Sequence, residues 1–186
     1  MIRAVEKEEL EQCIQIFHRG YGTVADEFGL TEENSPDRGR AALPCSRLQE
    51  EFDEGVMMYG YFLESRLVGF LGIKMAGDVC KLNDIIILPE YRNNGYGTEL
   101  LDFCRKKAVQ SGKKKIVLGM IDDNIRLRNW YISNGFVTTG YRKYEGAPYT
   151  VGDMECLLQQ VTEVNNNTVW CHISYWNGVK QNKLNL

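Results

Sequence analysis

Apolar residues recur at two different spacings along the chain, and these spacings predict an alternation of helices and strands. Helical spacing begins at Leu10, Cys13, Ile14 and Phe17, which predicts an N-terminal helix that ends at His18. The same spacing predicts further helices over residues 46–52, 95–110 and 124–133. Alternating or continuously aliphatic segments predict strands over residues 2–5, 56–63, 67–75, 79–88, 115–120, 136–144 and 154–158. We therefore expect a mixed α/β domain over residues 1–158.

Two segments stand apart from this alternation. Residues 20–43 are polar and rich in glycine, which predicts loops with at most a short helical turn. A connection of this length is uncommon in a compact domain unless it has a function, so it is a candidate substrate-facing lid or else a spacer. Residues 159–186 form a C-terminal extension, in which the alternation over 169–176 predicts one more strand.

Charge and cysteine content narrow the class of protein. The net charge of -3 argues against nucleic-acid or acidic-membrane partners, and the two basic runs, 105–107 and 113–115, fall near a predicted helix end. The six cysteines are scattered without ligand spacing, so neither a metal site nor a disulfide framework is expected. The first residues carry no apolar leader, and we expect a cytoplasmic protein without a membrane segment.

Residues 89–98 form a glycine-bearing loop between a buried strand and an amphipathic helix. The start of a helix presents unpaired N–H groups and positive dipole charge, and Gly95 and Gly97 let an anion approach the backbone. Arg92 adds a cation whose planar fork suits phosphate oxygens. The loop lacks the Gly-Lys-Ser/Thr ending of a P-loop, and Leu100 stands where a dinucleotide-binding fingerprint needs its third glycine.

The run from Asp84 to Gly97 resembles the acetyl-CoA signature of the GNAT superfamily of N-acetyltransferases, Arg/Gln-x-x-Gly-x-Gly/Ala after a strand that ends near a proline. A second block agrees in order, because Asn124 is followed by Trp130 and the sequence Tyr-Ile-Ser-Asn-Gly-Phe that ends at Phe136. The resemblance covers residues 56–158. It implies a central, mixed and mostly antiparallel sheet of about seven strands flanked by helices, with acetyl-CoA as co-substrate and no metal.

The resemblance also implies where the cofactor binds. The central strand would splay from its neighbour near Ile87, and the backbone of Ile87 and Leu88 would bind the pantetheine arm. Asn124 would contact the cofactor from the next helix, or would only cap that helix. The pyrophosphate would lie on the backbone N–H groups of the loop and helix start, namely Asn93, Asn94, Gly95, Tyr96, Gly97 and Thr98.

Acetyl transfer needs a neutral amine, a stabilised oxyanion and a proton for the departing thiolate. Tyr131 matches the family's general-acid position, although its ring can instead serve packing. We expect Asp84 to be the base, acting through a water, with the backbone N–H of Ile87 or Leu88 as oxyanion donor. Alternative bases are Glu54, Glu145 and Asp153, and the thiols Cys80 and Cys104 are expected to be buried and inert.

The resulting hypothesis is an N-acetyltransferase that moves an acetyl group from acetyl-CoA to a primary amine by direct attack. The amine belongs to a small molecule or to a peptide or protein, and the acidity of residues 20–43 favours a cationic one. The alternative is a non-catalytic acyl-CoA sensor or scaffold on the same fold, and a nucleotide-binding protein is a remote third reading. A homodimer is compatible with the aromatic extension after residue 158.

Overall fold

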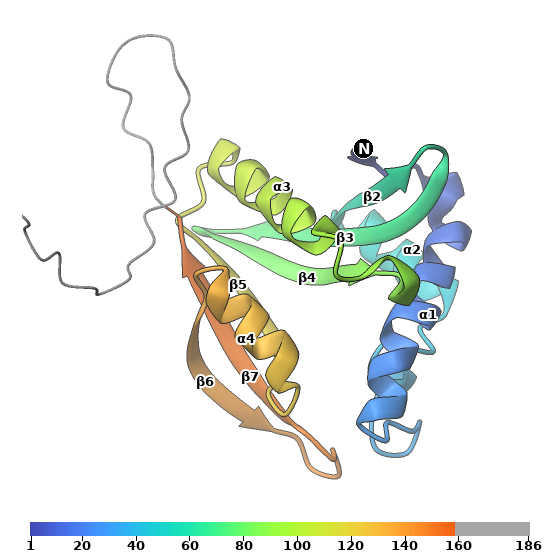
Figure 1. The fold of residues 1–186 in the computed structure, drawn as a ribbon, viewed down its shortest axis with the longest axis vertical. Coiled ribbons are helices and arrows are strands. Elements are labelled where there is room, and N and C mark those ends of the chain that lie inside the picture. Colours follow the sequence, from blue (N-terminus) through green and yellow to red (C-terminus); the bar gives the residue numbers. More distant parts are fainter. Residues whose placement is uncertain (159–186) are drawn as a thin grey trace, which may run out of the picture.

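The computed structural model describes residues 1–158, which contain a seven-stranded sheet with helices on both faces (Figure 1). The helices are α1 (Leu10–Glu27), α2 (Cys45–Asp53), α3 (Tyr96–Gln110) and α4 (Ile125–Ser133). The strands are β1 (Ile2–Ala4), β2 (Met57–Leu63), β3 (Arg66–Ala76), β4 (Val79–Ile87), β5 (Lys115–Ile121), β6 (Val137–Lys143) and β7 (Thr150–Leu157). Short 3₁₀ turns lie at Lys7–Glu9, Pro36–Arg38 and Pro89–Tyr91.

The sheet order is β1-β2-β3-β4-β5-β7-β6, and every neighbouring pair is antiparallel except β4 with β5. The expected mixed, mostly antiparallel sheet of about seven strands is therefore confirmed. The strand predicted over 169–176 lies outside the described residues. Within residues 1–158, none of the helices combines the length and apolarity that a bilayer crossing requires.

The helices divide between two apolar clusters, one on each face of the sheet. Side chains of α3 and α4, such as Leu100 and Tyr131, pack with inward-facing residues of β2 to β5 and β7. Side chains of α1 and α2, such as Phe17 and Leu48, pack on the opposite face against Phe70 of β3. Figure 1 shows α3 and α1 lying on either side of the β2–β4 part of the sheet. Helices thus cover both faces of the sheet at its centre, as the aliphatic sequence of β4 predicts.

A β-bulge changes which face the end of β4 presents. The register with β3 places one extra residue, Asn83, between two paired positions of β4. Before the bulge, Cys80 and Leu82 belong to the cluster under α3. After it, Ile86 belongs to the cluster under α1, because one inserted residue reverses the alternation of side chains. The bulge therefore turns Asp84 towards α1 and α2.

The strands β4 and β5 separate along their length. Their parallel pairing ends at Lys81 and Val117, although β4 continues to Ile87 and β5 to Ile121. The two halves of the sheet diverge beyond this point (Figure 1). The gap lies at the carboxyl ends of two parallel strands, which is where open α/β sheets bind ligands.

The backbone N–H of Ile87, at the end of β4, faces this gap. The N–H of Leu88 donates to the carbonyl of Val68 in β3 over 2.9 Å. Because successive residues of an antiparallel strand direct their backbone groups to opposite sides, the N–H of Ile87 points away from β3 and into the gap. The predicted splay is present, but it begins six residues before Ile87, at the end of the short parallel ladder.

The N-terminal helix is longer than its sequence pattern predicts. The predicted end at His18 is wrong, because α1 continues through Gly20 and Gly22 to Glu27. Gly20 lies where the helix presses on β4, and a Cβ atom there would come within 2.2 Å of Cγ2 of Ile86. The glycine thus permits a close helix–strand approach and does not end the helix. Only the remainder of residues 20–43 is irregular, apart from the turn Pro36–Arg38.

Candidate active site

The loop after β4 arrives at α3 in a conformation that glycine and asparagine favour. Gly95 is the N-cap of α3 with φ 85°, and Asn93 has φ 63°, so both lie in the left-handed region. Within the described part of the chain, no N-cap side chain bonds to the first turn of α3, which leaves its N–H groups available to a ligand. The amide of Asn94 donates back to the carbonyls of Tyr91 and Arg92, at 3.2 and 3.0 Å, and fixes the loop.

The guanidinium of Arg92 is directed to α1. It donates to the carbonyl of Gly20 at 2.9 Å, to the hydroxyl of Thr23 at 3.0 Å and to the carbonyl of Ile87 at 3.1 Å. Three of its five N–H groups are therefore used to tie the loop to α1 and β4. The sequence suggested that Arg92 binds phosphate directly, whereas in the structure its side chain orders the loop. The backbone N–H groups of residues 93–98 remain the predicted anion site.

The aromatic residue at the start of α3 belongs to a packed wall. The ring of Tyr96 lies 5.0 Å from that of Tyr61 on β2, and the hydroxyl of Tyr61 donates to Glu99 at 2.7 Å. A Cβ atom on Gly97 would meet Trp130 of α4 at 3.5 Å, so the glycine lets α4 lie close to the first turn of α3. Leu88 has both backbone groups occupied, by Val68 and Tyr91. Of the two predicted oxyanion donors, Ile87 is the one whose N–H faces the gap.

Asp84 is the most deeply buried carboxylate of the site, with 1% of its surface exposed. It accepts a hydrogen bond from the hydroxyl of Tyr21 at 2.9 Å, and the Nε and Nη2 atoms of Arg40 lie 2.8 and 3.2 Å from its two oxygens. Arg40 also makes a bidentate pair with Glu51 of α2, with both distances 2.9 Å. Burial raises the pKa of Asp84 to about 6, while Arg40 and Tyr21 oppose the rise.

Tyr131 lies on α4 with 4% of its surface exposed. Its ring packs edge to face against Phe136, with centroids 5.3 Å apart, and against Trp130 at 4.9 Å. Its hydroxyl makes no hydrogen bond within residues 1–158. Burial raises the pKa of the Tyr131 phenol, and the negative charge of the Asp84 carboxylate raises it further. The predicted acid and base lie on opposite faces of the sheet, Tyr131 in the cluster under α3 and Asp84 on the side of α1.

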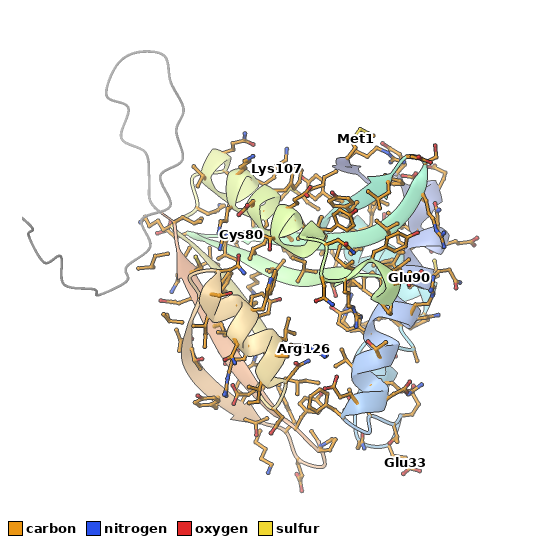
Figure 2. The ribbon with its side chains drawn as sticks, in the orientation of Figure 1. Met1, Glu33, Cys80, Glu90, Lys107 and Arg126 are labelled. Atoms are coloured by element: carbon orange, nitrogen blue, oxygen red, sulfur yellow. The ribbon has the colours of Figure 1, made fainter. Side chains whose placement is uncertain are left out.

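Two ion pairs lie near the gap, and one of them, between Arg126 and Glu27, joins the two halves of the sheet. Arg126 on α4 reaches towards α1 (Figure 2), where its Nη2 atom lies 3.4 Å from Glu27. Glu90, in the turn after β4, pairs with Arg19 of α1 at 2.9 Å. Both pairs are largely exposed and contribute little to stability, so their main effect is on the electrostatics at the rim of the gap.

A comparison with protein families decides the identity of this arrangement. The model described as the acetyltransferase (GNAT) family matches residues 19–136. The chain belongs to the GNAT acetyltransferase family. The match spans the gap, the glycine loop, α4 and Tyr131, and membership implies acyl transfer from an acyl-CoA.

Solved structures share the GNAT fold with this chain at low identity. The PaiA N-acetyltransferase of Thermoplasma acidophilum, in complex with coenzyme A, has a TM-score of 0.68 and 22% identity, covering 84% of this chain and 98% of its own. The ribosomal-protein-S18-alanine N-acetyltransferase of Escherichia coli has a TM-score of 0.69 and 16% identity, covering 91% and 99%. A Salmonella typhimurium protein solved with its cofactor acetyl-CoA has a TM-score of 0.67 and 14% identity, covering 89% and 97%.

The alternative bases and the two thiols considered in the sequence of this GNAT protein make their contacts with other residues. Glu54 pairs with Lys74 at 3.3 Å, Asp153 pairs with Arg142 at 2.6 Å, and Glu145 is exposed in the turn before β7. The thiols of Cys80 and Cys104 are fully buried and lie 3.9 Å from each other. Within residues 1–158, no group of three or more potential ligand side chains is arranged to bind a metal ion.

Sequence reasoning missed three residues of the site: Tyr21, Arg40 and Glu51. Tyr21 follows Phe17 by four residues and therefore continues the helical spacing of α1, which was a usable signal. Arg40 has φ 76° and follows three residues that are also in the left-handed region. No local sequence pattern predicts that such a segment would place an arginine beside Asp84.

Asn124 is the N-cap of α4, as one of its two predicted roles requires. Its Oδ1 atom accepts a hydrogen bond from the N–H of Leu127 at 3.0 Å, and the residue is 5% exposed. We expect Asn124→Ala to lower the free energy of unfolding by about 1 kcal/mol, because one N–H of the first turn loses its acceptor. Urea unfolding measures this loss, and isothermal titration with acetyl-CoA measures any separate loss of affinity. Unchanged stability would contradict the capping role.

Proposed function

We propose that this GNAT protein is an acetyl-CoA-dependent N-acetyltransferase that acetylates a primary amine by direct attack within the gap between β4 and β5. The observation that carries the proposal is the gap itself, where the parallel pairing of β4 and β5 ends, the N–H of Ile87 is free of β3, and the buried Asp84 lies three residues earlier on the same strand. A carboxylate with a raised pKa and a protonated phenol on opposite faces of one opening supply the base and the acid of acyl transfer.

The cofactor would bind along the open side of β4. The N–H of Ile87 would hydrogen-bond the thioester carbonyl at the end of the pantetheine arm, because the carbonyl of Ile87 already accepts from Arg92. The pyrophosphate would lie on the uncapped N–H groups at the start of α3, around Gly95 and Gly97, where the helix dipole is positive. Arg92 supports this site by holding the loop against α1.

The reaction follows from these groups. Asp84 receives a proton from the ammonium form of the acceptor, and the neutral nitrogen attacks the thioester carbonyl. The N–H of Ile87 stabilises the oxyanion. The C–S bond then breaks, the sulfur leaves with the bonding electron pair, and Tyr131 donates a hydrogen bond and its proton to that sulfur.

The high pKa of Tyr131 sets a condition on this last step. A phenol whose pKa lies above that of a thiol stays protonated, but full donation to the thiolate is uphill on its own. The nitrogen of the tetrahedral intermediate must also lose a proton, and it is a far stronger acid than the phenol. Passage of this proton to the sulfur through Tyr131 is favourable overall, so Tyr131 acts as a conduit as well as a donor.

The acceptor is a small-molecule amine or the amine of a peptide or protein. Carboxylates of α1 and of the following turn, Asp26, Glu27, Glu32 and Glu33, favour a cationic acceptor. Arg38 and Arg126 pair with the first two, so only part of this charge is available to a ligand.

The test is release of free CoA thiol from acetyl-CoA with polyamines, aminoglycosides, amino acids and short peptides. We expect turnover on at least one amine that greatly exceeds hydrolysis of acetyl-CoA alone. Binding of acetyl-CoA with slow hydrolysis and no acceleration by any amine would favour a non-catalytic sensor instead.

The activity should depend on pH through Asp84. The base must be ionised, and burial raises the pKa of Asp84 to about 6. We therefore expect kcat/KM to fall about tenfold per pH unit below roughly pH 6 and to level off above it. An exposed aspartate would place this limb near pH 4. Measurement of kcat/KM from pH 4 to pH 8 checks the prediction, and a limb near pH 4 would contradict it.

A further inference from the structure

We propose that Tyr21 is a catalytic residue that carries the proton of the acceptor ammonium to Asp84. This inference rests on the proposed acetyl transfer and specifies the path of its first step. Asp84 is 1% exposed and cannot touch an acceptor directly. Tyr21 and Arg40 are the two residues within 1–158 that hydrogen-bond to this carboxylate, and both are partly exposed. Of the two, only a hydroxyl can both accept and donate a proton.

The position of Tyr21 suits this task. The residue lies on α1 one turn after Phe17, and the two ring centroids are 5.8 Å apart. Its ring also packs against a small cluster of Ala25, Leu30 and Ala41, and Ile121, the last residue of β5, packs against the same cluster. The hydroxyl of Tyr21 meets Asp84 of β4, and its ring borders the same small cluster as the last residue of β5.

The charged and titratable groups around Tyr21 come from each neighbouring element. Asp84 of β4 accepts its proton, Arg40 faces the same carboxylate, and Glu51 of α2 holds Arg40. Arg40 keeps the Asp84 carboxylate stabilised in its ionised form, and the bond from Tyr21 to Oδ1 is the one path from this carboxylate to a neutral, proton-bearing group.

The proton balance of the step is simple. The ammonium donates one proton to the Tyr21 oxygen while the Tyr21 hydroxyl proton moves to Oδ1 of Asp84. The products are a neutral amine, an unchanged phenol and a protonated Asp84. No bond between heavy atoms changes, and the neutral amine then attacks the thioester as described above. Tyr21 occupies the place where the sequence analysis expected a bridging water.

The test compares Tyr21→Phe with the wild type over a range of pH. Phenylalanine keeps the packing on Phe17 and removes only the hydroxyl. We expect kcat/KM to fall by roughly 10²-fold or more at pH 7, with unchanged affinity for acetyl-CoA in isothermal titration. The defect should shrink steadily as the pH approaches the pKa of the acceptor amine, because the amine then arrives neutral and needs no relay. Tyr59→Phe is the matched control, since within residues 1–158 the one hydrogen bond of its hydroxyl is to the sulfur of Met57.

Two further outcomes separate the relay from its alternatives. The relay predicts that Tyr21→Phe combined with Asp84→Asn is about as slow as Tyr21→Phe alone, because both changes interrupt one path. A defect of Tyr21→Phe that is the same at every pH would indicate a structural role and would overturn the relay while leaving acetyl transfer intact. If the wild type acetylated no amine in the panel, the relay would fall together with the proposed function.

Discussion

Tyr131→Phe is expected to lower kcat by roughly 10²–10⁴-fold, the usual cost of removing a general acid. The change deletes one hydroxyl from a ring that packs between Trp130 and Phe136, so the fold should be retained. The hydroxyl has no hydrogen-bond partner within residues 1–158, and its removal leaves no protein group unpaired. We therefore expect the affinity for acetyl-CoA and the unfolding midpoint to stay close to those of the wild type.

The measurement is steady-state release of CoA thiol with the best acceptor, alongside isothermal titration of acetyl-CoA. Tyr141→Phe is a suitable control, because this tyrosine is 62% exposed on β6 and should be silent. A variant Tyr131→Phe with nearly full kcat would contradict the role of the phenol. A loss confined to KM would instead indicate that the ring only shapes the binding site.

The second large effect is expected at Gly20, whose substitution should destabilise the fold. A methyl group there would lie 2.2 Å from Cγ2 of Ile86, and a β-branched side chain in a packed strand cannot move aside freely. We expect Gly20→Ala to lower the free energy of unfolding by about 1–3 kcal/mol, the range for overpacked cores. The carbonyl of Gly20 also holds Arg92, so the cofactor loop should loosen as well.

Gly22, two residues later in the same helix, provides the matched control. A Cβ atom on Gly22 meets no atom within 4 Å. We expect Gly22→Ala to raise the free energy of unfolding by about 0.5–1 kcal/mol, because alanine favours the helix. Urea unfolding of both variants measures the contrast. Equal effects of the two substitutions would show that the contact of Gly20 with β4 is not tight.

These glycines also explain where sequence reasoning succeeded and failed on the fold. Glycine weakens a helix by about 1 kcal/mol relative to alanine, so the presence of Gly20 and Gly22 predicted that the N-terminal helix ends at His18. Tertiary packing overrides this preference. The strand, loop and helix from β4 to α3 were predicted within one or two residues, because a buried strand, a glycine turn and an amphipathic helix each carry a strong local signal. The bulge at Asn83 carries no such signal, since it depends on the pairing with β3.

The residues of the site likewise fall into those that a local sequence pattern predicts and those that only the fold brings together. Tyr131, Asp84 and the loop residues around Gly95 were identified from motifs that are contiguous in sequence. The partners of Asp84 come from α1 and from the segment before α2, and Glu51 of α2 holds one of these partners, Arg40. All three residues are separated from Asp84 by more than thirty positions. The contact of Arg92 with α1 could not be predicted either, because it involves Gly20, which lies beyond the predicted end of that helix.

The central claim, direct transfer of acetyl to an amine in the gap between β4 and β5, is tested most directly by tracing a labelled acetyl group. The protein is mixed with acetyl-CoA labelled in the acetyl carbonyl and with the best acceptor, and mass spectrometry then follows both the amine and the intact protein. We expect the label on the nitrogen of the acceptor and no acetylated protein at any time during turnover. Label that accumulates on a cysteine of the protein, or that appears only as free acetate, would contradict direct attack by the amine.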